Sequence, residues 1–139
     1  MSITTYLVED NQSILDNLTE TLQELVPVRV VAHADNQAQA SLWLDNHDAQ
    51  WQLAIVDLFL REGSGLGVLA NCHKLQHQQK IVVFTNYATP EIRRRALELG
   101  ADQVFDKSID LDLLLAYCTD LHEELKKPAA AILADSQQS

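Results

Sequence analysis

The stretch LAIVDLFLREGSGLGVL, residues 53–69, contains an apolar run that ends at one carboxylate and a glycine-rich turn. The apolar residues 53–56 predict a strand that is covered on both faces, which is typical of a parallel sheet between helices. Such a strand delivers Asp57 to its carboxyl end. In open α/β sheets that edge holds ligands and chemistry.

Outward from this stretch, strand-like and helix-like segments alternate along the whole chain. The predicted strands are residues 4–8, 28–32, 53–56, 80–84 and 102–106. The first predicted helix follows Asp10 and closes at Pro27, and the second and third are residues 37–46 and 65–75. The fourth begins at Thr89 and Pro90 and ends at Gly100, and the fifth is residues 110–125.

Apolar residues at helical spacing predict the buried stripes of these helices. They are Ile14, Leu18, Leu22 and Leu25 in the first helix, Ala38 and Leu42 in the second, and Leu114, Cys118, Leu121 and Leu125 in the fifth. The alternation predicts an α/β fold, a three-layer sandwich with a five-stranded parallel sheet in the middle. We expect one domain over residues 1–126, followed by a mobile tail over residues 127–139 whose Ile132 and Leu133 could dock on a partner.

The composition is that of an ordinary globular domain, with 139 residues, 47% of them apolar and 22% charged. A formal charge of -10 argues against direct binding to nucleic acid or to an anionic membrane surface. No apolar run approaches the roughly 20 residues that span a bilayer. Two cysteines, Cys72 and Cys118, are interpreted as unpaired thiols in a reducing compartment, so we expect a cytoplasmic protein.

Polar residues follow four of the predicted strands at the point where each ends. They are Glu9 with Asp10, Asp57, Thr85 and Lys107. Because parallel strands have their carboxyl ends at one edge, these side chains should converge there. Three carboxylates at one place disfavour mutual ionisation, and one ammonium together with one divalent cation would balance their charge. Oxygen ligands favour Mg²⁺.

This set of residues resembles the receiver domain of two-component response regulators over residues 3–125. The resemblance implies a flavodoxin-like sheet in the strand order 2-1-3-4-5, an order that the general rule for doubly wound folds also describes. It implies that Asp57 is the phosphoacceptor, which takes a phosphoryl group from a histidine kinase or a histidine phosphotransfer protein. The domain would phosphorylate and dephosphorylate only itself, and so is a signalling module rather than an enzyme.

The resemblance also implies how the other residues act. Asp10, Asp57 and the backbone carbonyl of Phe59 would hold Mg²⁺, with Glu9 acting through water. Lys107 would stabilise the transferring oxygens. Thr85 would donate its hydroxyl to the phosphoryl group and shift the face made by the fourth helix, fifth strand and fifth helix. That face would bind a downstream protein or a second copy of the chain.

The sequence departs from the family pattern at two positions near Lys107. The aromatic residue that often lies three residues before the lysine is Val104 here, so Tyr87 is a candidate for that switch role. The residue after the lysine, commonly a proline with a cis peptide, is Ser108. A cis bond before a non-proline residue costs about 2.5 to 4 kcal/mol, so we expect a different loop after the fifth strand.

Other interpretations remain open from sequence alone. A Mg²⁺-dependent phosphatase could use Asp57 as its nucleophile, although Phe59 stands where a second acid is usual. A flavin mononucleotide protein would need a Ser/Thr-rich loop after the first strand, where the chain has carboxylates. The pair His73 and His77, four residues apart, is a zinc candidate without an apparent third ligand. The arginines 93–95 are either a solvated helix face or a docking surface.

Overall fold

The computed structural model describes residues 2–72 and 78–127. Five strands alternate with five helices along these residues. The strands are β1 (Ile3–Val8), β2 (Val28–Ala34), β3 (Leu53–Val56), β4 (Lys80–Thr85) and β5 (Gln103–Asp106). The helices are α1 (Gln12–Leu25), α2 (Gln37–Asn46), α3 (Gly65–Asn71), α4 (Pro90–Glu98) and α5 (Leu111–Leu125). The predicted order of elements is therefore confirmed.

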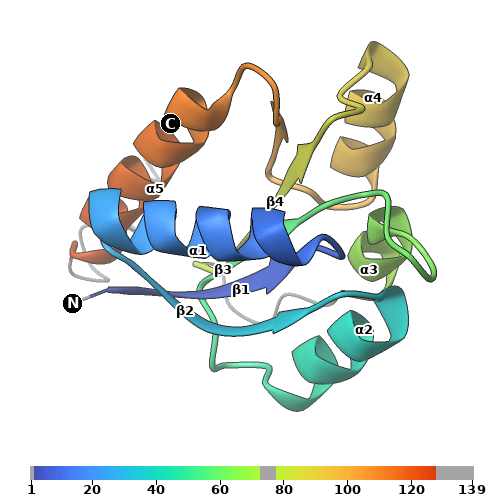
Figure 1. Cartoon of the computed structure of the whole chain (residues 1–139). Coiled ribbons are helices and arrows are strands. Elements are labelled where there is room, and N and C mark those ends of the chain that lie inside the picture. Colours follow the sequence, from blue (N-terminus) through green and yellow to red (C-terminus); the bar gives the residue numbers. More distant parts are fainter. Residues whose placement is uncertain (1, 73–77, 128–139) are drawn as a thin grey trace.

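All strand pairs are parallel, and the sheet has the order β2-β1-β3-β4-β5. This is the 2-1-3-4-5 order expected for a flavodoxin-like sandwich, and Figure 1 shows the helices packed around the central strands. The strand β3 lies in the middle of the sheet with all four residues buried. Its carboxyl end, and hence Asp57, has a strand on each side.

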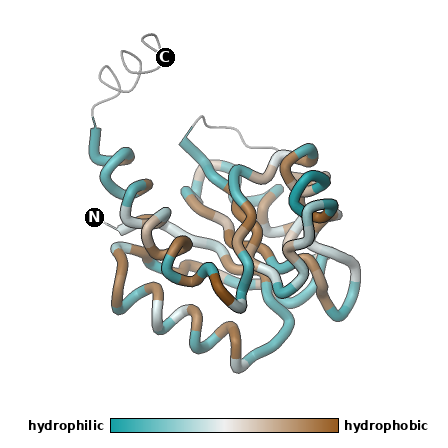
Figure 2. The backbone as a smooth tube through the Cα atoms, turned by 90° about the horizontal axis from the view of Figure 1, so that it is seen from above, coloured by the Kyte–Doolittle hydropathy of each residue, from teal (hydrophilic) through white to brown (hydrophobic). Residues whose placement is uncertain are grey.

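Among residues 2–72 and 78–127 the core consists of two hydrophobic clusters, one on each face of the sheet. On one face α1 and α5 supply six buried residues, Leu15, Leu18, Leu22, Leu114, Cys118 and Leu121. On the other face α2, α3 and α4 supply Ala40, Leu44, Val68, Leu69 and Ala96. The helices in Figure 2 accordingly alternate between hydrophobic and hydrophilic stretches, because only one side of each contacts the sheet.

The predicted buried stripe of α1 was wrong at one position, and that of α2 was wrong at both named positions. Leu25 is 63% exposed, because α1 ends there and the extended residue Val26 takes the next buried position. In α2 the buried residues are Ala40 and Leu44, while both predicted positions, Ala38 and Leu42, are exposed. Leu42 lies two positions from each of them, which places it on the opposite side of a helix with 3.6 residues per turn. The stripe predicted for α5 is confirmed.

Strand β3 has the predicted bounds, and each of the other four strands differs from the prediction by one or two residues at one end, as is usual for the ends of secondary-structure elements. The prediction for β2 ended at Ala32, and the strand continues to Ala34 along β1. The predicted third helix ran to residue 75, whereas α3 ends at Asn71. Residues 73–75 of that prediction, the zinc candidates His73 and His77, and residues 128–139 of the predicted tail lie outside the described residues. Within the described residues, no helix combines the length and apolarity that crossing a membrane requires.

Candidate functional site

Three of the predicted site residues directly follow a strand, and the backbone N–H of each is hydrogen-bonded to a residue of the neighbouring strand. The N–H of Glu9 donates to Ala34 O at 3.0 Å, and the N–H of Asp57 donates to Val8 O at 2.9 Å. The N–H of Lys107 donates to Thr85 O, also at 2.9 Å. The residues after the strands are therefore held in register with their neighbours, and their side chains meet at one edge.

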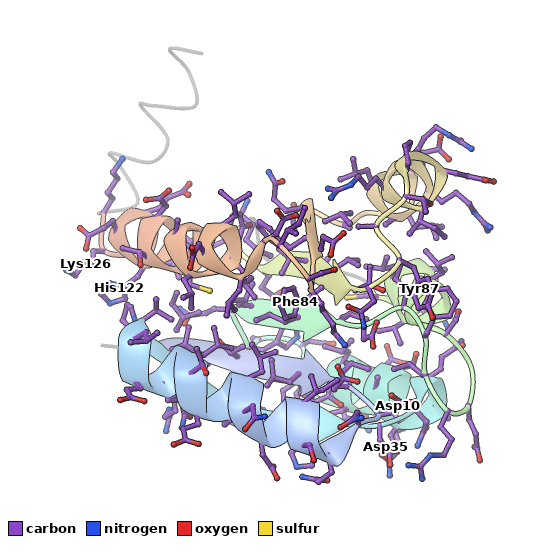
Figure 3. All side chains as sticks on the ribbon, turned by 45° about the horizontal axis from the view of Figure 1, so that its top comes forward. Asp10, Asp35, Phe84, Tyr87, His122 and Lys126 are labelled. Atoms are coloured by element: carbon purple, nitrogen blue, oxygen red, sulfur yellow. The ribbon has the colours of Figure 1, made fainter. Side chains whose placement is uncertain are left out.

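Three carboxylates converge at this edge as the sequence predicted. One oxygen from each of Glu9, Asp10 and Asp57 can be chosen such that all three lie within 4.8 Å of one another. Glu9 and Asp57 are buried, with 5% and 9% of their surface exposed, while Asp10 is half-buried. In Figure 3, Asp10 and Tyr87 lie toward one end of the molecule, and His122 and Lys126 of α5 lie at the other.

The ammonium group of Lys107 lies between two of these carboxylates. It donates to Asp57 Oδ2 at 2.9 Å and forms a second short hydrogen bond to Glu9 Oε1. Burial raises the pKa of Glu9, although the hydrogen bond from Lys107 opposes this. Burial alone would lower the pKa of Lys107, but its bonds to Glu9 and Asp57 outweigh that effect and raise it. Lys107 is thus held as a cation beside the central carboxylate.

Thr85 ends β4 and is fully buried. Its hydroxyl oxygen accepts a hydrogen bond from the N–H of Tyr87 at 3.3 Å, so the first turn after β4 is tied to it. Tyr87 is 55% exposed, and its ring packs on the ring of Phe59, with 4.3 Å between ring centroids. The contact between these two rings was not predicted from the sequence. A sequence feature that could have indicated it is that Phe59 and Tyr87 each stand two residues after a site residue, Asp57 and Thr85, at the ends of the neighbouring strands β3 and β4.

The turn after β5 is fixed by hydrogen bonds between Asp106 and Ser108. Asp106 Oδ1 accepts from the Ser108 N–H at 2.8 Å and from the Ser108 hydroxyl at 2.6 Å, and these bonds lower the pKa of Asp106. The described residues contain no cis peptide bond. Val104, at the position of the family's switch aromatic, is buried in the core.

The residues at this edge suit a small, hard cation. Glu9, Asp10 and Asp57 offer oxygen ligands only, which is the donor type that Mg²⁺ takes at 2.0–2.1 Å in an octahedron. Opposite ligands of such an octahedron are about 4.2 Å apart, so a spread of 4.8 Å needs small side-chain adjustments or one bridging water. The N–H of Phe59 lies 3.5 Å from Asp57 Oδ1, which keeps this residue's backbone next to the carboxylate.

Comparison with known proteins identifies the class to which this fold and site belong. The family model described as the response regulator receiver domain matches residues 5–119, and the chain belongs to this family. Receiver domains are the signalling domains of two-component systems, generally not enzymes in the usual sense, and bind Mg²⁺ at an acidic pocket. Their partners are phosphodonor kinases or phosphotransfer proteins.

One curated relative is the DNA-binding transcriptional regulator NtrC of Azospirillum brasilense, which is 28% identical over 141 residues. The alignment includes 100% of this chain but only 28% of the relative's length. This chain therefore corresponds to a small part of that protein.

Solved structures share the fold at low sequence identity. The BeF3-activated DrrB receiver domain matches with a TM-score of 0.71 and 21% identity, covering 88% of this chain and 99% of that chain. The response regulator domain of Thermotoga maritima CheB matches with a TM-score of 0.73 and 14% identity, covering 92% and 99%. A CheX–CheY–BeF3–Mg²⁺ complex from Borrelia burgdorferi gives 0.73 and 14%, covering 91% and 90%.

Proposed function

We propose that this receiver domain takes a phosphoryl group onto Asp57 from a phosphohistidine of a sensor kinase or a histidine phosphotransfer protein. The observation that carries the proposal is the position of Lys107, whose ammonium is bonded to both Asp57 and Glu9 while Asp10 completes an all-oxygen cluster. The Borrelia burgdorferi complex includes both BeF3 and Mg²⁺, which supports a metal and a phosphoryl-like group in a protein of this fold.

In the proposed reaction an oxygen of Asp57 attacks phosphorus, an O–P bond forms, and the P–N bond to the donor's histidine breaks. Asp10, Asp57 and the carbonyl of Phe59 would hold Mg²⁺, and Glu9 would act through water. When bound, Mg²⁺ supplies positive charge for the phosphoryl oxygens. Lys107 places its ammonium where negative charge develops on the same oxygens. Positioning and charge neutralisation then supply most of the catalysis.

We propose that the signal leaves the site through Thr85. Its hydroxyl is engaged by the Tyr87 N–H and would turn to donate to the phosphoryl oxygens, which draws residues 86–89 inward. The face made by α4, β5 and α5 would then bind a downstream protein or a second copy of the chain. The exposed side chains of Leu97 on α4 and Leu113 on α5 support this choice of face.

A Mg²⁺-dependent phosphatase is the second candidate function for this site. That chemistry usually needs a second acid two residues after the nucleophile, and this place holds Phe59, whose ring packs on Tyr87. With no acid here to protonate a leaving group, the structure favours storage of the phosphoryl group over turnover on many substrates.

We propose the domain limits from the end of α5 and the location from the placement of the two cysteines. The receiver would comprise residues 1–126, since α5 ends at Leu125 and contributes Leu114, Cys118 and Leu121 to the core. Cys72 and Cys118 belong to clusters on opposite faces of the sheet, so they are not placed to form a disulfide with each other. This fits a reducing, cytoplasmic location.

The proposal is tested by incubating the protein with acetyl phosphate or phosphoramidate and Mg²⁺, followed by intact mass spectrometry. The wild-type chain should gain one labile phosphate, and Asp57→Asn should gain none. Chelation of the metal should abolish the uptake. Continuous release of phosphate from unrelated phosphomonoesters, dependent on Asp57, would instead support the phosphatase interpretation.

A further inference from the structure

The loop between Asp57 and α3 is tied to the first residue of α2, Gln37. The Gln37 N–H donates to Glu62 O at 3.1 Å, and its side-chain Oε1 accepts from the Ser64 N–H at 2.9 Å. The main chain of Gln37 is thus bonded to Glu62 of the loop, and its side chain is bonded to Ser64. Gln37 is far from Asp57 in sequence and is not one of the residues expected at the site.

Two glycines leave the space that the Gln37 side chain fills. A Cβ on Gly63 would lie 2.4 Å from Gln37 Cβ, and a Cβ on Gly67 would lie 2.3 Å from Gln37 Nε2. Gly63 also has a φ of +75°, a conformation that favours glycine. The loop and the start of α3 therefore enclose the Gln37 side chain and restrict it to one position.

The tied part of the loop leads back to the phosphoacceptor. Ser64 forms an antiparallel bridge with Phe59, and the N–H of Gly65 donates to Leu58 O at 2.9 Å. A Cβ on Gly65 would lie 2.2 Å from the carbonyl oxygen of Asp57. Ser64 and Gly65 are thus packed directly on residues 57–59. A displacement of Ser64 therefore also displaces the backbone of Phe59.

We propose that Gln37 is a positioning residue of the phosphoacceptor site. By bonding to Ser64 and Glu62, Gln37 holds the loop in place. The same loop contains Phe59, whose carbonyl is the proposed metal ligand. Loss of the Gln37 side chain leaves that carbonyl poorly oriented toward the cation. This inference rests on the proposed function, because it assigns a role in holding Mg²⁺ for phosphoryl transfer. Groups that orient metal ligands commonly change metal affinity 10- to 100-fold when they are removed.

The test compares Gln37→Ala with the matched control Gln23→Ala. Gln23 Oε1 also accepts a backbone N–H at 2.9 Å, from Val30, but between α1 and β2. Each variant loses one hydrogen bond between a glutamine side chain and a backbone N–H. Of these two bonds, the one made by Gln37 is to the loop between Asp57 and α3, and the one made by Gln23 is not. Mg²⁺ is titrated calorimetrically into the apoprotein, and phosphate uptake from phosphoramidate is measured against Mg²⁺ concentration. Gln37→Ala should raise the Mg²⁺ dissociation constant and the half-saturating concentration roughly tenfold, with near-normal uptake at saturating Mg²⁺.

A second variant separates positioning from a general loss of stability. Gly67→Ala places a methyl group against the Gln37 amide and displaces it, while alanine is a better helix former than glycine within α3. Gly67→Ala should therefore weaken Mg²⁺ binding as Gln37→Ala does without melting earlier. In the Gln37→Ala background the same substitution should have little further effect, because the two changes remove one interaction.

Mg²⁺ affinities of Gln37→Ala and Gly67→Ala within twofold of those of the wild type and Gln23→Ala would overturn this inference while leaving the proposed function intact. Failure of the wild type itself to bind Mg²⁺ and take up phosphate would overturn the proposed function, and the role of Gln37 with it.

Discussion

The Nζ atom of Lys107 lies 2.9 Å from Asp57 Oδ2, and the same ammonium is hydrogen-bonded to Glu9. One cation from the end of β5 thus neutralises part of the charge that β1 and β3 bring to the edge of the sheet. Its side chain is only 10% exposed, so solvent screens this interaction weakly.

Lys107→Ala should slow phosphate uptake roughly 100-fold, since loss of one donor to developing oxyanions typically costs that much. Without Mg²⁺ it should also lower the free energy of unfolding by roughly 1–3 kcal/mol, because buried carboxylates lose their partner. Lys126→Ala is the control, as Lys126 pairs only at 3.3 Å with the exposed Glu123. Uptake by Lys107→Ala at the wild-type rate would show that the ammonium has no role in transfer.

Thr85→Ala should separate phosphate uptake from the structural response. The variant keeps Asp57, Lys107 and the carboxylates, so uptake should stay within about tenfold of wild type. It lacks the hydroxyl proposed to pull residues 86–89 inward, so amide hydrogen exchange there should no longer change on phosphorylation. Thr85→Ser retains the hydroxyl and serves as the control. A normal exchange response in Thr85→Ala would contradict the proposed switch.

Arg93 should matter for stability, unlike its neighbour Arg94. Arg93 donates to Ala88 O at 3.0 Å and to Val104 O at 2.8 Å, and so joins α4 to β5. Arg93→Ala should lower the free energy of unfolding by about 1 to 2 kcal/mol. Arg94 pairs with Glu98 on the exposed face of α4, and Arg94→Ala should change stability by less than about 0.5 kcal/mol. Urea denaturation of both variants measures the difference, and equal stabilities would refute it.

Cys118 should resist thiol reagents in the folded protein. Burial raises its pKa to about 12, so at pH 8 only roughly one thiol in 10,000 is ionised. The unfolded chain has a cysteine pKa near 8.5 and loses its proton first, so folding stability should fall as pH rises from there toward 12. Ellman's reagent should modify Cys118 only after denaturation, with Cys118→Ala identifying the signal. Rapid native labelling of Cys118 would be inconsistent with its burial.

The sequence predicted the sheet and its edge because both depend on local patterns. An apolar run of four residues is recognisable as a buried central strand, and parallel strands bring their ends together whatever the helices do. Glu9, Asp57 and Lys107 could therefore be assigned to one edge before the structure was known. Which face of α1 and of α2 is buried was predicted less accurately. Several apolar residues in each helix satisfy helical spacing, and only the packing against the sheet selects among them.

The role of Gln37 could not be predicted, because its contacts cross from α2 to the loop before α3. The only local sign of this contact is the spacing of Gly63, Gly65 and Gly67, which indicates a close approach without naming the residue that approaches. The loop after β5 was expected to differ, but the two bonds between Ser108 and Asp106 depend on a turn geometry that the pattern does not specify.

Conversion of Asp57 to an acyl phosphate can be detected directly by chemical trapping. Wild-type protein is treated with phosphoramidate and Mg²⁺, reduced with borohydride and digested, and the peptides are sequenced by mass spectrometry. Borohydride converts an aspartyl phosphate to homoserine and leaves a free carboxylate unchanged. We predict homoserine at position 57, dependent on Mg²⁺. Aspartate at 57 with phosphate or homoserine at another residue would contradict the account.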